Sequence, residues 1–176
     1  MPGEVVHAGD RPAMLIRLTK LSDQRHVLEV ERADRSRERA ELETRSTLHH
    51  DLTHYAVEEA AGLEHGFFGS LAAGRTVAEL SGRAGEGTLA YAGPMLEIER
   101  TVAVLQRLAK ADEDPAALHA RITALLALQD ETPPGWFTLQ LVCAVRERLR
   151  QLVGQWRKTP YGATLELTWG RGRRAH

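Results

Sequence analysis

The central stretch of the chain, residues 46–63, reads STLHHDLTHYAVEEAAGL. At about 100° per residue, a helix in this stretch separates its apolar side chains from a second, polar set on nearly the opposite face. Ser46 or Thr47 is expected to be the N-cap, and Gly62 to end the helix. The apolar face comprises Leu48, Leu52, Tyr55, Ala56 and Leu63, and the polar face comprises His50, His54 and Glu58. The stretch therefore predicts an amphipathic helix with a core face and a histidine face.

Histidines are concentrated in and just after this stretch. The chain has eight histidines in 176 residues, and four of them fall within residues 49–65. Even scattering would place roughly one histidine in a segment of that length. The four are His49, His50, His54 and His65. Composition alone does not explain this local excess, which points to a functional role for the helix.

The pentapeptide of residues 50–54, HDLTH, resembles the HExxH motif of zinc metallopeptidases, with Asp51 in place of the glutamate. In that motif two histidines one helical turn apart bind zinc, and the glutamate acts as general base on a metal-bound water. The resemblance implies that His50 and His54 are metal ligands and that Asp51 is the proton acceptor. Aspartate is one methylene shorter than glutamate, which shortens its reach toward such a water.

A third ligand would have to come from elsewhere in the chain, and the sequence leaves several choices open. His65, Glu64 and Glu58 all follow the two histidines closely. We predict a zinc or other divalent metal site built from His50, His54 and His65, with Asp51 and Glu58 as candidate catalytic proton acceptors. The glycine-rich residues 81–93 are expected to form a hinge or lid beside it.

Two other interpretations of the histidine face remain open. One is a solvated polar face on which His54 and Glu58 form an ordinary pair at i and i+4. The other is metal-free acid–base chemistry by His54 together with Asp51 or Glu58.

Composition is typical of a single globular domain that spans residues 1–176, with flexible ends at 1–12 and 170–176. The chain is 43% hydrophobic and 27% charged, an ordinary balance for a domain of this length. Its one cysteine, Cys143, lies in an apolar helical run and is expected to be a buried structural thiol, which fits a reducing compartment. The sequence shows no secretory signal and no long apolar segment, so we expect a cytoplasmic protein with no membrane contact. Arginine dominates the basic residues, which hints at a GC-rich bacterial genome.

Three segments near the N-terminus and one near the C-terminus carry the alternation of β-strands. Residues 13–21 and 26–31 alternate and are separated by a turn-like segment, which predicts a hairpin. Residues 38–45 are expected to form a charged edge strand, with a short helix as the alternative. Residues 163–169, ATLELTW, show the clearest strand pattern in the chain.

Between these strands the sequence predicts helices. Thr76 and Glu79 form a capping-box pattern, Pro94 opens a helix to about residue 110, and Asp114 with Pro115 opens the next one. The longest helix is expected over residues 136–159. Strands at both ends around a helical middle predict an α+β domain in which the C-terminal strand joins the N-terminal strands in an antiparallel sheet, packed against about four helices. An all-helical bundle is the second choice.

The last part of the chain is basic. From residue 145 onward eight basic residues stand against only Glu147 and Glu166. Arg146, Arg150 and Arg157 form a stripe on the longest helix. This stripe could bind an acidic partner or nucleic acid, pair with acidic residues of the third strand, or remain solvated. A second hypothesis is therefore a non-catalytic interaction or regulatory module. Glu59, on the apolar side of the histidine helix, is expected to lie at its edge or to pair with an arginine.

Overall fold

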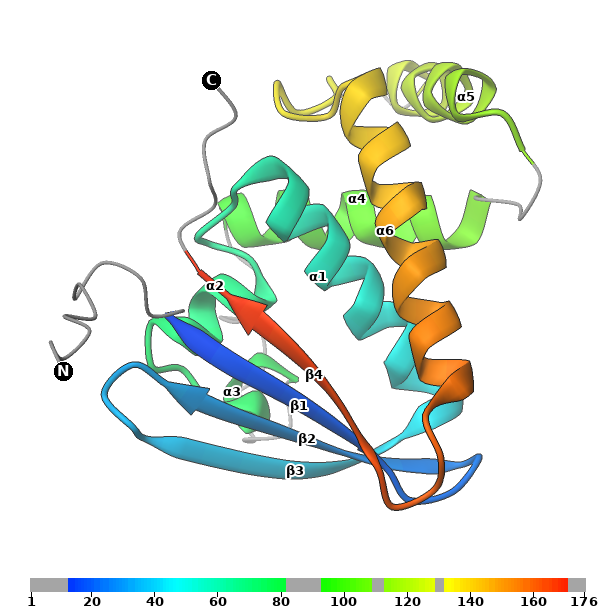
Figure 1. The fold of residues 1–176 in the computed structure, drawn as a ribbon. Helices are drawn as coiled ribbons and strands as arrows, with labels where there is room; N and C mark the ends of the chain where they lie inside the picture. Colours follow the sequence, from blue (N-terminus) through cyan, green and yellow to red (C-terminus); the bar gives the residue numbers. More distant parts are fainter. Residues whose placement is uncertain (1–12, 82–92, 109–112, 129–131, 171–176) are drawn as a thin grey trace, which may run out of the picture.

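The structure of the protein is a computed structural model that describes residues 13–81, 93–108, 113–128 and 132–170 (Figure 1). In chain order its strands are β1 (Met14–Lys20), β2 (Arg25–Arg32), β3 (Arg37–Glu43) and β4 (Thr164–Trp169). A π-helical turn, η1 (Thr44–Leu48), leads into α1 (His49–Ala61). The other helices are α2 (Phe67–Ala72), α3 (Val77–Leu80), α4 (Pro94–Leu108), α5 (Pro115–Ala127) and α6 (Leu139–Lys158).

The four strands form one antiparallel sheet in the order β3-β2-β1-β4. Ile16 of β1 lies between Val30 of β2 and Leu167 of β4 in the register. The C-terminal strand thus pairs with the N-terminal hairpin, which confirms the α+β prediction and excludes the helical bundle. The charged third segment is a strand at the edge of the sheet, as its sequence predicted.

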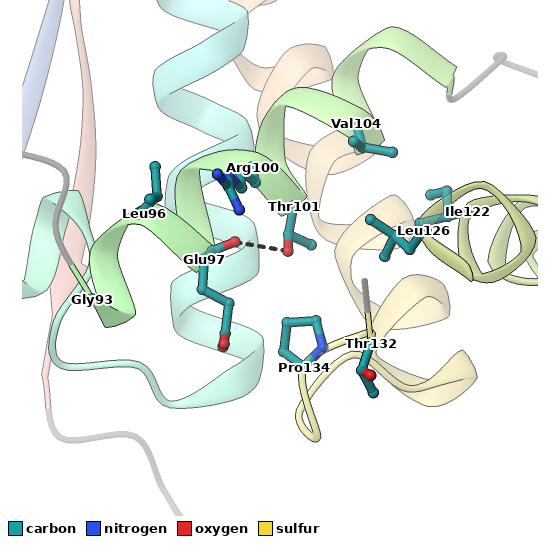
Figure 2. A pocket seen from close by; sticks show the side chains of 10 residues that line it. All are labelled: Gly93, Leu96, Glu97, Arg100, Thr101, Val104, Ile122, Leu126, Thr132 and Pro134. Atoms are coloured by element: carbon teal, nitrogen blue, oxygen red, sulfur yellow. Dashed lines mark hydrogen bonds between the residues drawn. The ribbon is translucent and has the colours of Figure 1, made fainter. Parts of the chain in front are cut away.

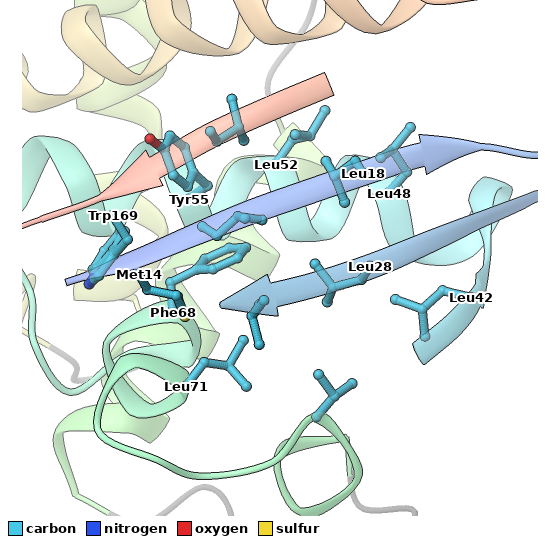
Figure 3. Packing of buried hydrophobic residues seen from close by; sticks show 14 of the residues in the cluster. Met14, Leu18, Leu28, Leu42, Leu48, Leu52, Tyr55, Phe68, Leu71 and Trp169 are labelled. Atoms are coloured by element: carbon cyan, nitrogen blue, oxygen red, sulfur yellow. The ribbon is translucent and has the colours of Figure 1, made fainter. Parts of the chain in front are cut away.

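One face of the sheet carries the helices, and the other carries charges. Met14, Ile16 and Leu18 alternate along β1 and are buried against α1, α2 and α6 (Figure 3). On the opposite face Arg17 pairs with Glu29, Glu31 and Glu166 of the neighbouring strands. The alternation read from the sequence is therefore the alternation between a core face and a charged face.

Helix α1 lies between two hydrophobic cores. Leu52 and Tyr55 pack with the inner face of the sheet, whereas Ala56 and Val57 belong to a second cluster formed with α4, α5 and α6. As a result every residue from Asp51 to Glu58 is buried. The helix has no solvated polar face over this span, and its histidine face is covered by other helices.

The ends of the helices follow their sequence signals in most places. Gly62 ends α1 in the left-handed conformation with φ 63°, and its N–H donates to the carbonyl of Glu58. Thr76 and Glu79 form the predicted capping box, and Asp114 caps α5. The predicted N-cap of α1 is wrong: Ser46 and Thr47 lie inside η1, and the Thr47 hydroxyl donates to the backbone carbonyl of Glu43.

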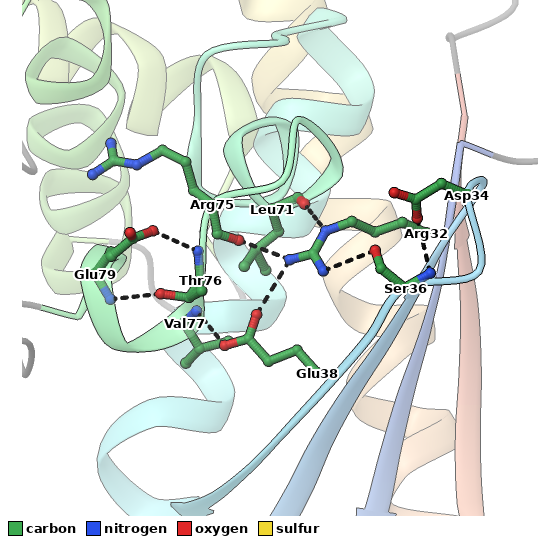
Figure 4. A network of polar contacts seen from close by, with 9 residues as sticks. All are labelled: Arg32, Asp34, Ser36, Glu38, Leu71, Arg75, Thr76, Val77 and Glu79. Carbon is green, nitrogen blue, oxygen red and sulfur yellow. Dashed lines mark hydrogen bonds and ion pairs between the residues drawn. The ribbon is translucent and has the colours of Figure 1, made fainter.

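A half-buried arginine ties α2 and α3 to the sheet (Figure 4). Arg32 of β2 donates to the backbone carbonyls of Leu71 and Arg75 and forms an ion pair with Glu38 of β3 at 3.2 Å. The other carboxylate oxygen of Glu38 accepts from the backbone N–H of Val77, at the start of α3. These contacts fix the segment that follows α1 against the edge of the sheet.

Two further expectations are corrected. Cys143 is exposed, because it lies beside rather than within the buried stripe of α6 that contains Val142 and Val145. The longest helix begins at Leu139 rather than at Trp136, because Thr138 is its N-cap and accepts from the N–H of Leu141. Most of the glycine-rich segment and the two predicted flexible ends lie outside the described residues. Within the described ranges, no helix combines the length and apolarity needed to cross a bilayer.

Candidate metal centre

His50 and His54 of α1 meet a carboxylate from α4. The two imidazole rings lie side by side, with centroids 4.6 Å apart and planes at 76°. Glu99 places its Oε1 3.1 Å from Nε2 of His54 and its Oε2 3.8 Å from Nε2 of His50. One potential ligand atom from each of the three residues lies within 4.8 Å of the other two. These three side chains form a group that could hold a metal ion.

The group is closed on one side and open on the other. The His54 side chain is 2% exposed, whereas that of His50 is 36% exposed. The exposed fraction of the Glu99 side chain, 18%, is intermediate between those of the two histidines. A small ligand or a water molecule would therefore approach from the side of His50, near the start of α1.

Glu58 holds His54 from the closed side. Its carboxylate accepts the backbone N–H groups of Phe67, Phe68 and Gly69, at the N-terminus of α2, over 2.8, 3.0 and 3.1 Å. Its Oε1 also lies 3.1 Å from Nδ1 of His54. Because a carboxylate only accepts hydrogen bonds, Nδ1 of His54 must carry the proton, and Nε2 is the nitrogen directed toward Glu99.

This contact needs a glycine opposite the carboxylate. A Cβ added at Gly66 would lie 2.1 Å from the carboxyl carbon of Glu58. Only glycine lets the turn before α2 come close enough for three N–H groups to bind one carboxylate. The segment GFFG of residues 66–69 is thus folded around Glu58.

His54 sits between two carboxylates and is charged when only protons are bound. Burial lowers the pKa of His54, but its contacts with Glu58 and Glu99 outweigh burial and raise the pKa to about 9. Nε2 is nevertheless a buried nitrogen for which no described residue provides an aligned hydrogen bond, since Glu99 at 3.1 Å is placed for an ion pair only. A cation bound in place of the Nε2 proton would give this nitrogen a partner.

The structure brings some of the predicted site residues together and separates others. His50 and His54 converge with a third donor, and Glu58 pairs with His54 at i and i+4 as predicted. His65 is exposed and is not part of this group, whose third side chain is Glu99. Asp51 is buried on α1 but also lies outside the group. The catalytic roles of Asp51 and Glu58 stay predictions.

Glu99 was missed because it is far from the histidines in sequence. It stands between Met95 and Val102 on the face of α4 that is otherwise apolar and packs against α1. Gln106 follows two turns later on the same face. Polar residues that interrupt an apolar helical stripe are the signal that could have identified both.

A cavity beside α4 is separate from this group. It has a volume of about 340 Å³ and lies between α4, α5 and residues 132–134 (Figure 2). Ile122 and Leu126 line it together with Thr101, and Glu97 and Arg100 stand at its rim. Its lining contains no histidine, and it lies on the face of α4 that points away from α1. It therefore plays no part in the proposed metal site.

The arginines of α6 have partners within the chain. Arg150 pairs with Glu147 one turn earlier, and Arg146 donates to the backbone carbonyl of Glu113. Glu59 forms an ion pair with Arg148 at 2.8 Å, which confirms that it pairs with an arginine. Arg157 lies on the same helix and is exposed. Binding of nucleic acid or an acidic partner through this stripe stays a prediction.

Comparison with protein-family models, with curated proteins and with solved structures gives no match for this chain. Its function must therefore be argued from the geometry of the site.

Proposed function

We propose that the protein binds a divalent transition-metal ion, zinc being the one we expect, through Nε2 of His50, Nε2 of His54 and the carboxylate of Glu99. The observation that supports this most is the approach of Glu99, from a separate helix, to the buried Nε2 of His54 at 3.1 Å. Two imidazoles and one carboxylate are the ligand set of several catalytic zinc sites and of non-haem iron sites.

The spacing of the three groups suits such an ion. In a tetrahedral zinc site with bonds of 2.0–2.2 Å, neighbouring ligand atoms are roughly 3.3 Å apart. Glu99 already lies 3.1 Å from one histidine nitrogen and 3.8 Å from the other. Small side-chain rotations would therefore complete the site without a shift of α1 or α4.

The charge balance favours a cation as well. With only protons bound, the carboxylates of Glu58 and Glu99 carry two negative charges against one positive charge on His54. A divalent ion that displaces the Nε2 proton of His54 leaves this buried cluster neutral. Glu58 then supplies the carboxylate of a carboxylate–histidine–metal arrangement, which orients the ligand and raises its basicity.

Three protein ligands leave at least one coordination position for water or substrate, on the open side at His50. Zinc in such a site lowers the pKa of its bound water to about 7, which provides a nucleophile at neutral pH. The function we propose is therefore that of a metal-dependent, hydrolase-like protein. In it Asp51 keeps the role of proton acceptor that the resemblance to the HExxH motif implies.

Metal content tests the proposal directly. Wild-type protein purified from zinc-supplemented cells should contain close to one zinc per chain, and Glu99→Gln should lose it. Glu97→Gln is the matched control, because Glu97 lies half a turn away on α4 and bonds the indole N–H of Trp136 instead. Affinity for Zn²⁺ and Co²⁺, measured by competition with a chromophoric chelator, should fall at least about 100-fold in Glu99→Gln. This exceeds the 10- to 100-fold loss that typically follows removal of a residue that contacts only a ligand of the metal. Wild type that binds neither ion would overturn the proposal.

A further inference from the structure

Gln106 of α4 connects two histidines at the open side of the site. Its Oε1 lies 3.0 Å from Nδ1 of His50, and its Nε2 lies 3.3 Å from Nδ1 of His49. Glu99 precedes Gln106 by two helical turns on the same face of α4. Helix α4 therefore presents the Glu99 carboxylate to Nε2 of His50 and also presents the Gln106 amide to Nδ1 of the same ring.

The amide fixes where the proton of His50 resides. An amide oxygen accepts and an amide N–H₂ donates, so in this orientation Nδ1 of His50 is the donor and Nδ1 of His49 is the acceptor. Neutral His50 then has its lone pair on Nε2, the atom that faces Glu99. The reverse orientation of the amide would place the lone pair of His50 on the wrong nitrogen.

The rings of His54 and His50 are thus held in place by different residues. His54 is buried and clamped by Glu58, which itself accepts three backbone N–H groups. His50 is partly exposed, and among the described residues the hydrogen-bond partner of its ring is Gln106. The hydrogen bond to Gln106 is therefore the contact that selects the tautomer and the orientation of the His50 ring.

Resting on the proposed metal site, we infer that Gln106 is the positioning residue of this site. It selects the Nδ1–H tautomer of His50 and holds the ring so that Nε2 faces the metal position, while His49 orients the amide. The affinity of the site for a transition metal is then set in part by a residue that never touches the ion. Loss of such an outer-shell partner typically weakens metal binding 10- to 100-fold.

Three variants test this inference. Gln106→Leu removes the acceptor and should weaken Co²⁺ and Zn²⁺ binding 10- to 100-fold. Gln106→Glu keeps an accepting oxygen and should restore the affinity to the wild-type value or above. Arg107→Gln is the control for charge, because it changes the net charge by the same amount as Gln106→Glu on an exposed position of the same helix. It should leave the affinity unchanged.

A second readout does not depend on metal. The ¹⁵N shifts of the His50 ring in metal-free protein should report the Nδ1–H tautomer in wild type and in Gln106→Glu, and a mixture in Gln106→Leu. The Gln106→Leu variant should melt close to wild type, because Gln106 lies at the edge of the fold. Wild-type affinity and an unchanged tautomer in Gln106→Leu would overturn the inference while leaving the metal site intact. Wild type that binds no metal would instead overturn the proposed function, whatever the tautomer.

Discussion

Replacing Glu58 with glutamine should strongly destabilise the protein, although it changes only one oxygen atom. The carboxylate is fully buried and accepts four hydrogen bonds, three from the backbone of α2 and one from His54. Each of its oxygens accepts two of them. A glutamine keeps one oxygen and turns an N–H₂ group toward the donors that faced the other, so two bonds are lost.

The size of the effect follows from these contacts. Hydrogen bonds to a charged group contribute about 1.5–3 kcal/mol each, so the loss of two should cost about 3 to 6 kcal/mol. A domain of this size has only about 5–15 kcal/mol of stability in total. The melting temperature of Glu58→Gln should fall by roughly 6 to 24 °C, at 2–4 °C for each kcal/mol.

Thermal and urea unfolding, followed by circular dichroism, measure this loss. Glu59→Gln is the matched control, since Glu59 is the next residue on α1 and has a largely exposed ion pair with Arg148. Its replacement should cost no more than about 1 kcal/mol. Equal stabilities of the two variants would refute the idea that Glu58 anchors α2 to α1.

Three other perturbations test separate parts of the fold. Burial lowers the pKa of His26 from 6.5 to about 4, so the unfolded chain binds a proton that the folded chain does not. The free energy of unfolding should therefore fall by about 2 to 3 kcal/mol between pH 6.5 and pH 4. Urea titrations at several pH values should show a smaller fall for His26→Phe. Parallel pH profiles of wild type and variant would contradict this. Gly66→Ala brings a Cβ within 2.1 Å of Glu58 and should cost about 3 kcal/mol or more. By contrast, Gly154→Ala in α6 meets nothing within 4 Å and should raise stability by about 1 kcal/mol; equal melting shifts would count against this contrast. Arg32→Ala removes the half-buried partner of Glu38 and should cost about 3 kcal/mol in chemical unfolding; a loss below about 1 kcal/mol would argue against the network in Figure 4.

The fold was largely predictable because each strand has only one buried face. Alternation along residues 14–20 and 164–169 revealed the core side of β1 and β4, and strands at both ends of the chain had to pair for their edges to be covered. The start of α1 was not predictable from capping rules. Ser46 and Thr47 have the right side chains for an N-cap, but the backbone enters α1 through a π-helical turn that contains both, and Leu48 occupies the N-cap position.

The site was predictable only where it is local. The spacing of His50 and His54 places both rings on one helix face, whatever surrounds the helix. The interrupted apolar stripe of α4 marks Glu99 as an unusual residue, but its meeting with the two histidines depends on the crossing of α1 and α4, which no local pattern encodes. The predicted burial of Cys143 was wrong for a related reason. The apolar run around it is wider than the stripe of α6 that the neighbouring elements cover.

The position of α1 between two cores also explains why the site is buried rather than solvated. A histidine and two carboxylates placed between helices are less stabilising than apolar side chains of similar volume would be, and removing one of them leaves another unpaired. The chain nevertheless places Glu58 and Glu99 against His54, and three backbone N–H groups of α2 hold the Glu58 carboxylate. Such a shell restricts the imidazole to one orientation before any ligand arrives, which lowers the entropy that binding must overcome. A fixed inner histidine beside a more exposed outer one, His50, would suit the proposed metal site, because an ion could enter from solution and keep one side accessible.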